Sequence, residues 1–334
     1  MHPAYAGEVD RIARAVLAEL LPYRRAHALA TPDDIRCIES VQLPLLRRQI
    51  AEGSALQMLI PAFPAKSPSC RKVLGALPDL GERLSLSFLG RLCGRIQRLH
   101  APGAELIICS DGHVFGPAVG LDDDTITDYQ RHIERMVQCV GHGHLRTFAL
   151  ADCSGLPTAT EGDYEASRVE LIRRYGTPLP TVRTRLLASE EGRRQLTGMM
   201  RFMLEDREGI APDLSRSAAQ QEARDAAYVV IQRSWAWGDL LSERFPEAFR
   251  LSIHPQPPSS LKFGIHLLPT RSDWLTPWHG VAATDGQRFE LMKRHQAEAL
   301  GGRVAYVDGL PSHFVLDALD AIPGVRKRAE TRQE

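Results

Sequence analysis

The sequence has no excess of charge of either sign, with 41 basic and 41 acidic residues among 334. A protein whose main partner is a nucleic acid or an anionic membrane usually carries a basic face and a positive net charge. No apolar run approaches the length needed to cross a bilayer. We therefore expect neither nucleic acid nor membrane as a partner, and we expect small molecules instead.

Cysteine is scarce, and the six cysteines are scattered without a C-x-x-C pair. This spacing argues against a zinc ribbon and against a disulfide scaffold. The segment 1–20 mixes charged with apolar residues and contains no signal-peptide core. We expect a cytoplasmic protein with reduced thiols.

Several catalytic signatures are also missing. No G-x-G-x-x-G follows the first expected strand, which disfavours a standard dehydrogenase, and no G-x-S-x-G marks a hydrolase nucleophile. His142 and His144 have no nearby carboxylate or cysteine to complete a metal site. The run 122–124 of three aspartates is expected to cap a helix, so no metal site is predicted.

The chain does contain alternating apolar runs and amphipathic segments. Runs at 55–60, 106–109 and 147–151 are separated by helical periodicity over 84–99 and 126–140. This order predicts an α/β fold with a Rossmann-like, doubly wound and mostly parallel sheet.

The other segments are expected to surround this sheet. Residues 1–54 are predicted to form an N-terminal helical layer, with a helix start at Thr31. Residues 55–325 are predicted to form the Rossmann-like catalytic domain, which contains a helical insertion over about 162–235. Antiparallel hairpins are expected toward its C-terminal end, one of them signalled by an Asp-Gly turn. Residues 326–334 form a charged tail.

The stretch from Phe249 to Ala283 has an unusual concentration of ionisable side chains. Two apolar runs, 249–253 and 263–268, are predicted to be strands joined as a hairpin by a Pro/Ser turn. The ionisable residues on and beside them are His254, Lys262, His266 and His279.

Such groups on apolar strands must be paired or used, because burying an unpaired charge is costly. Imidazole titrates near neutral pH and suits proton transfer, although isolated histidines more often cap strands or face solvent. Lys262 and His266 are four residues apart and would share one face of a strand, with His254 across the turn. This clustering favours an acid–base site.

Polar residues also follow the other expected strands, as Lys66, Asp111 and Asp152 do. Ligands bind outside the carboxyl ends of parallel strands, so these residues and His254 are expected to line one rim of the sheet. The loop 66–72 is a candidate phosphate or carboxylate site, with a solvated basic loop as the alternative.

A second candidate lies in the segment 110–113, which reads Ser-Asp-Gly-His. Its glycine permits a tight turn and a close ligand approach, and Asp111 is suited to orient an amine or a hydroxyl. The alternative is a simple Asx turn.

Five segments resemble the isocyanide (isonitrile) synthases of the pyoverdine/dityrosine biosynthesis family. In chain order, between about residues 60 and 285, they are FPAKSPSCRKVLGALPDLGE, SDGHVFGPAVGLDDD, GMMRFMLED, RLSIHPQPPSSLKFGIHLLP and WLTPWHGVA. The resemblance implies a Rossmann-like, lyase-type enzyme of secondary metabolism that joins an L-amino acid, usually tyrosine or tryptophan, to ribulose 5-phosphate. The amine nitrogen then becomes an isonitrile whose carbon derives from C2 of the sugar phosphate, and no metal or organic cofactor is required.

This chemistry assigns candidate roles to the residues above. The candidate catalytic residues are His254, Lys262, His266, His279 and Asp111. The candidate substrate-binding residues are Lys66, Ser67, Arg71, Lys72, Ser110, Gly112, His113 and Trp278. For Lys262 three roles stay open: holding the phosphate, binding the amino-acid carboxylate, or forming a Schiff base with the ketone.

Two positions depart from the family's pattern. Ser69 stands where the family generally has Asn, and Pro117 stands where it commonly has Asp. Some relatives carry a fused oxygenase domain that this sequence lacks, so a separate Fe(II)/2-oxoglutarate oxygenase is expected to act on the product. The alternatives are a sugar-phosphate-binding module without turnover and, less favoured, a methyltransferase-like enzyme.

Overall fold

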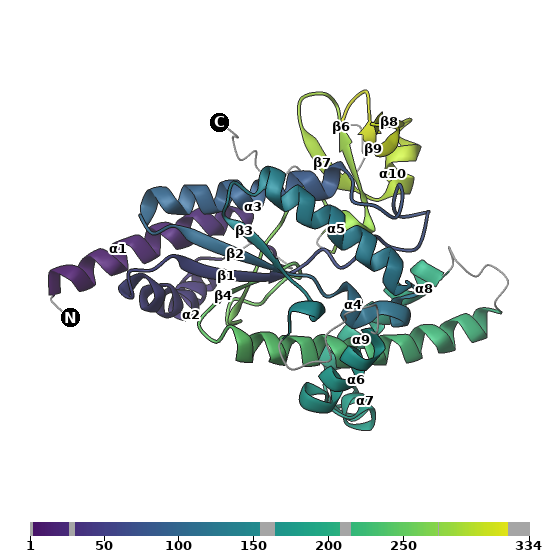
Figure 1. Cartoon of the computed structure of the whole chain (residues 1–334), viewed down its shortest axis with the longest axis horizontal. Helices are drawn as coiled ribbons and strands as arrows, with labels where there is room; N and C mark the ends of the chain where they lie inside the picture. Colours follow the sequence, from purple (N-terminus) through teal and green to yellow (C-terminus); the bar gives the residue numbers. More distant parts are fainter. Residues whose placement is uncertain (1–2, 27–30, 154–163, 208–214, 273, 320–334) are drawn as a thin grey trace.

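The computed structural model describes residues 3–26, 31–153, 164–207, 215–272 and 274–319. Its centre is a five-stranded sheet in the order β3-β2-β1-β4-β5, in which all neighbours are parallel (Figure 1). The strands are β1 (Leu56–Pro61), β2 (Ala104–Cys109), β3 (Leu145–Phe148), β4 (Phe249–Ser252) and β5 (Lys262–Gly264). The strand order changes direction between β1 and β4, as in doubly wound sheets, which confirms the predicted α/β fold.

Helices cover both faces of this sheet. One face carries Met58, Ile60 and Leu106 and packs into a cluster with helices α1, α2, α3 and α5. The other face, with Leu59 and Ile107, packs on the second half of α9 (Figure 1). The helices are α1 (Pro3–Leu20), α2 (Pro32–Ala51), α3 (Leu80–Leu99), α5 (Asp123–Val140) and α9 (Arg216–Arg244). Burial on both faces explains why these strands are continuous apolar runs.

The helices begin where side chains cap them. Thr31 accepts a hydrogen bond from the amide of Asp34 at 3.1 Å, which confirms the predicted start of α2. Asp122 accepts from the amide of Thr125 at 2.7 Å, so the acidic run caps α5, as predicted. None of the described helices is long and apolar enough to span a membrane.

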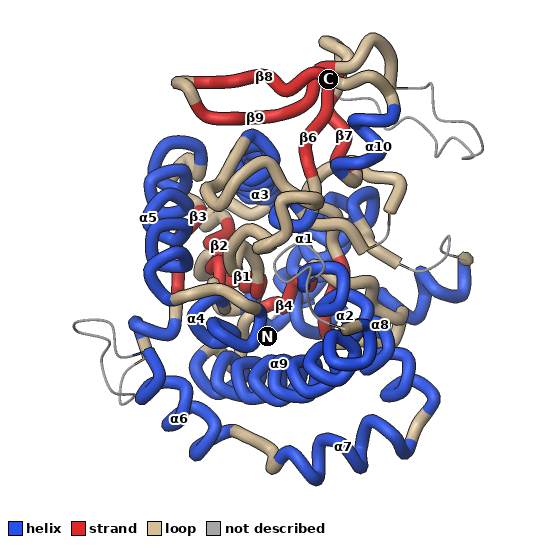
Figure 2. The backbone as a smooth tube through the Cα atoms, turned by 90° about the vertical axis from the view of Figure 1, so that its right-hand side faces the viewer, coloured by secondary structure: helices blue, strands red, loops and turns tan. Residues whose placement is uncertain are grey.

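The segment between β3 and β4 is helical in its described parts. It contains α6 (Tyr164–Tyr175), α7 (Leu179–Ala188) and α8 (Glu190–Arg207) before α9. Helices α7 and α8 share an apolar cluster with the first half of α9. Figure 2 shows α6 and α7 outside α9, on the side away from the second sheet. The expected boundary of the insertion near 235 falls inside α9.

A second, four-stranded sheet has the order β7-β6-β9-β8 (Figure 2). It consists of β6 (Val281–Thr284), β7 (Phe289–Met292), β8 (Arg303–Val307) and β9 (Leu310–Val315), with α10 (Arg294–Ala299) between β7 and β8. The pairs β6–β7 and β8–β9 are antiparallel, which confirms the expected C-terminal hairpins. The predicted charged tail lies outside the described residues.

The hairpin predicted from the histidine-rich stretch is wrong. β4 and β5 pair in parallel, with Arg250 opposite Lys262 and Ser252 opposite Gly264. Residues 253–261 therefore do not make a tight turn but return the chain to the starting end of β4. The other edge of β5 is occupied by the segment after α1, because Arg25 donates its amide hydrogen to the carbonyl of Gly264 at 2.8 Å.

Candidate active site

The site lies at the carboxyl edge of the first sheet, where the strand order changes direction between β1 and β4. Ligands of doubly wound sheets bind at this position. Three segments meet there: the post-β1 loop (residues 62–79), the residues that follow β4, and the short 3₁₀ turn η4 (Pro277–His279). The backbone joins two of them, since the amide of Ser67 donates to the carbonyl of Trp278 at 2.8 Å.

His279 is a neutral imidazole in this site. Its Nδ1 lies 2.9 Å from Oγ1 of Thr276, and its ring meets the ring of Phe202 edge-on, with centroids 4.4 Å apart. Burial lowers the pKa of His279 well below its ordinary value, and the positive charges of Lys72 and Lys66 lower it further. A neutral imidazole can accept a proton at neutral pH.

His254 follows β4 and combines solvent access with a low pKa. Its side chain is exposed, and its ring centroid lies 6.1 Å from that of Trp274. The surrounding protein nevertheless lowers the pKa of His254 to about 4 by desolvation, and the charges of Arg25 and Lys262 act in the same direction. A pKa shifted this far by desolvation and by nearby positive charge makes His254 a candidate for a functional group.

Asp111 follows β2 and is half-buried. Burial raises the pKa of its carboxyl group to about 7. Within the described part of the chain, no cationic side chain forms an ion pair with it. A carboxyl group that is desolvated and uncompensated is suited to bind a ligand's ammonium group or to transfer a proton.

Lys66, expected in an open phosphate cradle, is buried instead. Its side chain is 1% exposed, and its ammonium group lies 2.8 Å from Asp79, 2.9 Å from Glu82 and 3.1 Å from the carbonyl oxygen of Pro277. Burial raises the pKa of Glu82 to about 7, with the positive charge of Lys66 opposing the rise. In this structure Lys66 supports the turn that carries His279 and has no access to a ligand.

Ser67 and Lys72 converge on the same carboxylate. Ser67 donates its hydroxyl hydrogen to Oδ1 of Asp206 at 2.5 Å, and Nζ of Lys72 lies 2.8 Å from the same oxygen. Lys72 also lies 3.3 Å from Glu205 and 4.5 Å from the centroid of the Phe202 ring. These partners come from the last two turns of α8.

The other residues of the post-β1 loop have different surroundings. Arg71 is exposed. Ser69, at the first departure from the family's pattern, is fully buried, and its backbone bonds to the hydroxyl of Ser67 and to the amide of Lys72 shape the loop. Pro117, at the second departure, is exposed in the 3₁₀ turn η2 (Gly116–Val119).

Four of the expected substrate-binding residues are packed inside the protein. Ser110 donates to the carbonyl of Phe63 at 2.9 Å, and Trp278, 1% exposed, packs on the Phe63 ring at 5.2 Å between centroids. His113 is 1% exposed and stacks on Tyr164 at 3.5 Å between centroids. A Cβ atom on the fourth, Gly112, would lie only 2.1 Å from the carbonyl oxygen of Pro64. These contacts hold the loops that follow β1 and β2 together.

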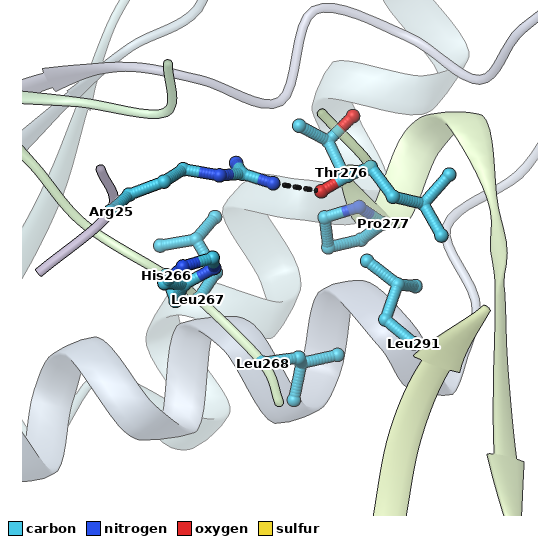
Figure 3. Close-up of a pocket in the computed structure, with 8 residues that line it drawn as sticks. Arg25, His266, Leu267, Leu268, Thr276, Pro277 and Leu291 are labelled. Atoms are coloured by element: carbon cyan, nitrogen blue, oxygen red, sulfur yellow. Dashed lines mark hydrogen bonds between the residues drawn. The ribbon is translucent and has the colours of Figure 1, made fainter. Parts of the chain in front are cut away.

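Lys262 and His266 do not share a strand face, because β5 ends at Gly264. Lys262 is exposed at the start of β5, beside Arg250. His266 lies beyond the other end of β5 and lines a small pocket with Arg25, Leu267, Leu268, Leu275, Thr276, Pro277 and Leu291. Figure 3 shows Arg25 on the same side of this pocket as His266, with its guanidinium group reaching toward Thr276 and Pro277, where it donates to the carbonyl of Leu275 at 2.5 Å.

A family model described as "Pyoverdine/dityrosine biosynthesis protein" matches residues 46–304. The chain belongs to the pyoverdine/dityrosine biosynthesis family. It is 49% identical to an L-tyrosine isonitrile synthase of Pseudomonas aeruginosa, over 94% of this chain and 97% of that protein. It is 44% identical to the L-tyrosine isonitrile synthase of Xenorhabdus nematophila, over 93% of each chain.

Two further comparisons extend this relationship. The L-tryptophan isonitrile synthase AmbI1 of Fischerella ambigua is 34% identical over 91% of this chain and 95% of its own length. The crystal structure of the PvcA protein from Pseudomonas aeruginosa superposes with a TM-score of 0.85 at 49% identity, covering 91% of this chain and 99% of that chain. The fold of this family member is therefore the fold of PvcA.

The contribution of α8 to the candidate site was not predicted from the sequence. Phe202 and Asp206 lie four residues apart, so they share one face of the helix and reach the site together. Their segment, GMMRFMLED, contributes to the resemblance to the pyoverdine/dityrosine family, but nothing in its periodicity places it against the post-β1 loop. Thr276, the partner of His279, was missed for the same reason, since a loop residue gives no periodic signal.

Proposed function

We propose that this protein is an isonitrile synthase that converts the amino group of an aromatic L-amino acid into an isonitrile. L-Tyrosine is the first candidate, because the relatives at 49% and 44% identity are L-tyrosine isonitrile synthases. L-Tryptophan is the second, from the relative at 34% identity. The proposed carbon donor is C2 of ribulose 5-phosphate, which makes the enzyme lyase-type because carbon–carbon bonds of the sugar must break.

The observation that carries this proposal is that three side chains with shifted pKa values lie at one edge of the sheet. His254 and His279 are neutral at physiological pH, and Asp111 titrates near it. An amino acid arrives as an ammonium ion and must lose a proton before its nitrogen can attack a ketone. Neutral imidazoles suit that transfer, and a carboxyl group near its pKa suits either binding of the ammonium or proton return.

Each substrate has candidate partners in the site. Ser67 and Lys72 are proposed to bind the phosphate of the sugar, with the exposed Arg71 at the entrance. Asp111 is proposed to bind the ammonium group or a sugar hydroxyl. Lys262 is exposed, which leaves it free to contact either the phosphate or the amino-acid carboxylate. We propose that a separate Fe(II)/2-oxoglutarate oxygenase consumes the product.

The test is incubation of the purified protein with L-tyrosine and ribulose 5-phosphate carrying carbon-13 at C2, followed by mass spectrometry. We expect an isonitrile one mass unit heavier than the product from unlabelled sugar, and label at C1 should not enter the isonitrile. His254→Gln should lower the rate by about 10² to 10⁴ as expected for loss of an acid–base group. His132→Gln, at a half-buried position of α5, is the matched control.

Failure to form an isonitrile from any amino acid would refute the proposal. If the protein binds ribulose 5-phosphate without consuming it, the binding-module alternative is favoured, and ligand-dependent stabilisation would measure that binding.

A further inference from the structure

Ser67 and Lys72 are held in place by hydrogen bonds within their own loop. The amide of Ser69 donates to the hydroxyl of Ser67 at 3.2 Å, and the amide of Lys72 donates to the carbonyl of Ser69 at 2.9 Å. This loop leaves β1 next to β4, at the position where doubly wound sheets bind their ligands. The structure thus presents a hydroxyl and an ammonium donor at a ligand-binding edge.

Both donors are occupied by an anionic group of the protein itself. Oδ1 of Asp206 receives the hydroxyl of Ser67 at 2.5 Å and the ammonium group of Lys72 at 2.8 Å. Asp206 is only 3% exposed, so its carboxylate fills the space between the donors. A serine hydroxyl and a lysine ammonium group that meet at one oxygen are equally suited to a phosphate oxygen.

Asp206 reaches this position from a helix whose apolar packing lies elsewhere. In α8, Leu196 and Met203 belong to the cluster that also contains Ala227 and Ile231 of α9. The last turns of α8 also contact the post-β1 loop, through Glu205 and Asp206 and through Phe202, whose ring packs against this cluster as well. Such polar contacts can be exchanged for ligand contacts at small net cost, because the donors are satisfied in both states.

The ionised form of Asp206 is also destabilised at its position between Ser67 and Lys72. Burial raises the pKa of Asp206, although Lys72 and Ser67 oppose that rise. A phosphate monoester brings more oxygens and more negative charge than a carboxylate, so it can satisfy the same donors better.

We propose that Asp206 occupies the anion subsite of Ser67 and Lys72 in the ligand-free protein, and that the phosphate group of a phosphate monoester displaces it. This inference deepens the proposed function, on which it rests for the identity of the ligand as a sugar phosphate. Displacement also moves Phe202, whose ring contacts both Lys72 and His279.

Calorimetric titration with inorganic phosphate and with ribulose 5-phosphate tests this competition. Asp206→Asn removes the competing charge and keeps the shape of the side chain, so both ligands should bind about tenfold more tightly than to the wild type. Glu205→Gln is the matched control, since Glu205 also contacts Lys72 but is 56% exposed, and it should change affinity less than threefold. Adding Lys72→Met to Asp206→Asn should abolish the gain.

Equal or weaker binding to Asp206→Asn would overturn the proposal. Hydrogen exchange of the wild-type protein gives a second test that needs no variant: phosphate should speed exchange over residues 200–207, and protection there would contradict displacement. Both tests are independent of turnover. A protein that behaves as expected here but forms no isonitrile would refute the proposed reaction and leave the displacement of Asp206 standing.

Discussion

The absence of a side chain at Gly112 allows the loops after β1 and β2 to pack closely together. A Cβ atom there would lie 2.1 Å from the carbonyl oxygen of Pro64 and 2.7 Å from Cγ2 of Ile126, so the loops after β1 and β2 would have to separate. We expect Gly112→Ala to lower the free energy of unfolding by about 1 to 3 kcal/mol, the usual cost of overpacking. Urea unfolding measures this change in the free energy of unfolding.

Gly75→Ala is the matched control for this substitution. Gly75 lies in the post-β1 loop, which Gly112 contacts through Pro64, and a Cβ atom at Gly75 meets nothing within 4 Å. This variant should unfold within about 0.5 kcal/mol of the wild type, as surface substitutions usually do. Equal effects of the two substitutions would show that close packing at Gly112 is unimportant.

At the residue scale, the sequence predicted which residues follow the strands but not what each one contacts. Asp111 and His254 were placed at the carboxyl edge of the sheet from strand order alone, because the ends of parallel strands meet there. Lys66 was assigned to an open cradle, whereas the structure pairs it with Asp79 and Glu82. Pairing depends on how α3 packs against the loop, and that packing leaves no local pattern.

At the scale of elements, the start of α3 and the turn η4 are joined by one buried lysine. Removing the charge of Lys66 leaves the carboxylates of Asp79 and Glu82 together without a cation. We expect Lys66→Met to lower the free energy of unfolding by about 3 to 5 kcal/mol, as for other broken buried ion pairs. Arg48→Met, which breaks an exposed pair with Glu247, should cost no more than about 1 kcal/mol.

The effect of Lys66→Met should also depend on pH. The folded-state pKa of Glu82 is about 7, above its ordinary value of 4.5, so the folded protein holds this proton more tightly than the unfolded chain does. Glu82 therefore stabilises the folded state less as pH rises between these values. Without Lys66 its pKa should rise further, so the variant should lose more stability at pH 8 than at pH 6. An equal loss of stability at pH 6 and at pH 8 would contradict a raised pKa of Glu82.

At the scale of elements, the strands and helices could be predicted from the sequence but the pairing of β4 with β5 could not. The apolar runs and helix caps were predicted because local periodicity and capping residues determine them. The parallel pairing of β4 with β5 was not, because residues 253–261 form a connection shorter than the usual parallel crossover. The segment containing Arg25, distant in sequence, completes the other edge of β5.

At the scale of the whole molecule, the site is assembled from distant parts of the chain. Loops after β1, β2 and β4 supply one side, α8 of the helical segment supplies Phe202 and Asp206, and η4 supplies His279 just before the second sheet. The charges in this assembly act on one another, since Lys72 and Lys66 both lower the pKa of His279. The pH dependence of the proposed reaction should therefore be a property of the assembled candidate site.

The pH profile of kcat/KM for the amino acid should reflect this assembly. Asp111 has a pKa of about 7, so it is protonated below that pH and is a carboxylate above it, the form proposed to bind the substrate ammonium. We expect kcat/KM to fall about tenfold per pH unit below 7. Because the pKa of His254 is about 4 and that of His279 is also low, neither should add a limb near 6.5. In Asp111→Asn the limb near pH 7 should vanish, leaving a lower and flat profile of kcat/KM between pH 5.5 and 8. A limb that persists at the same pH in this variant would belong to another group.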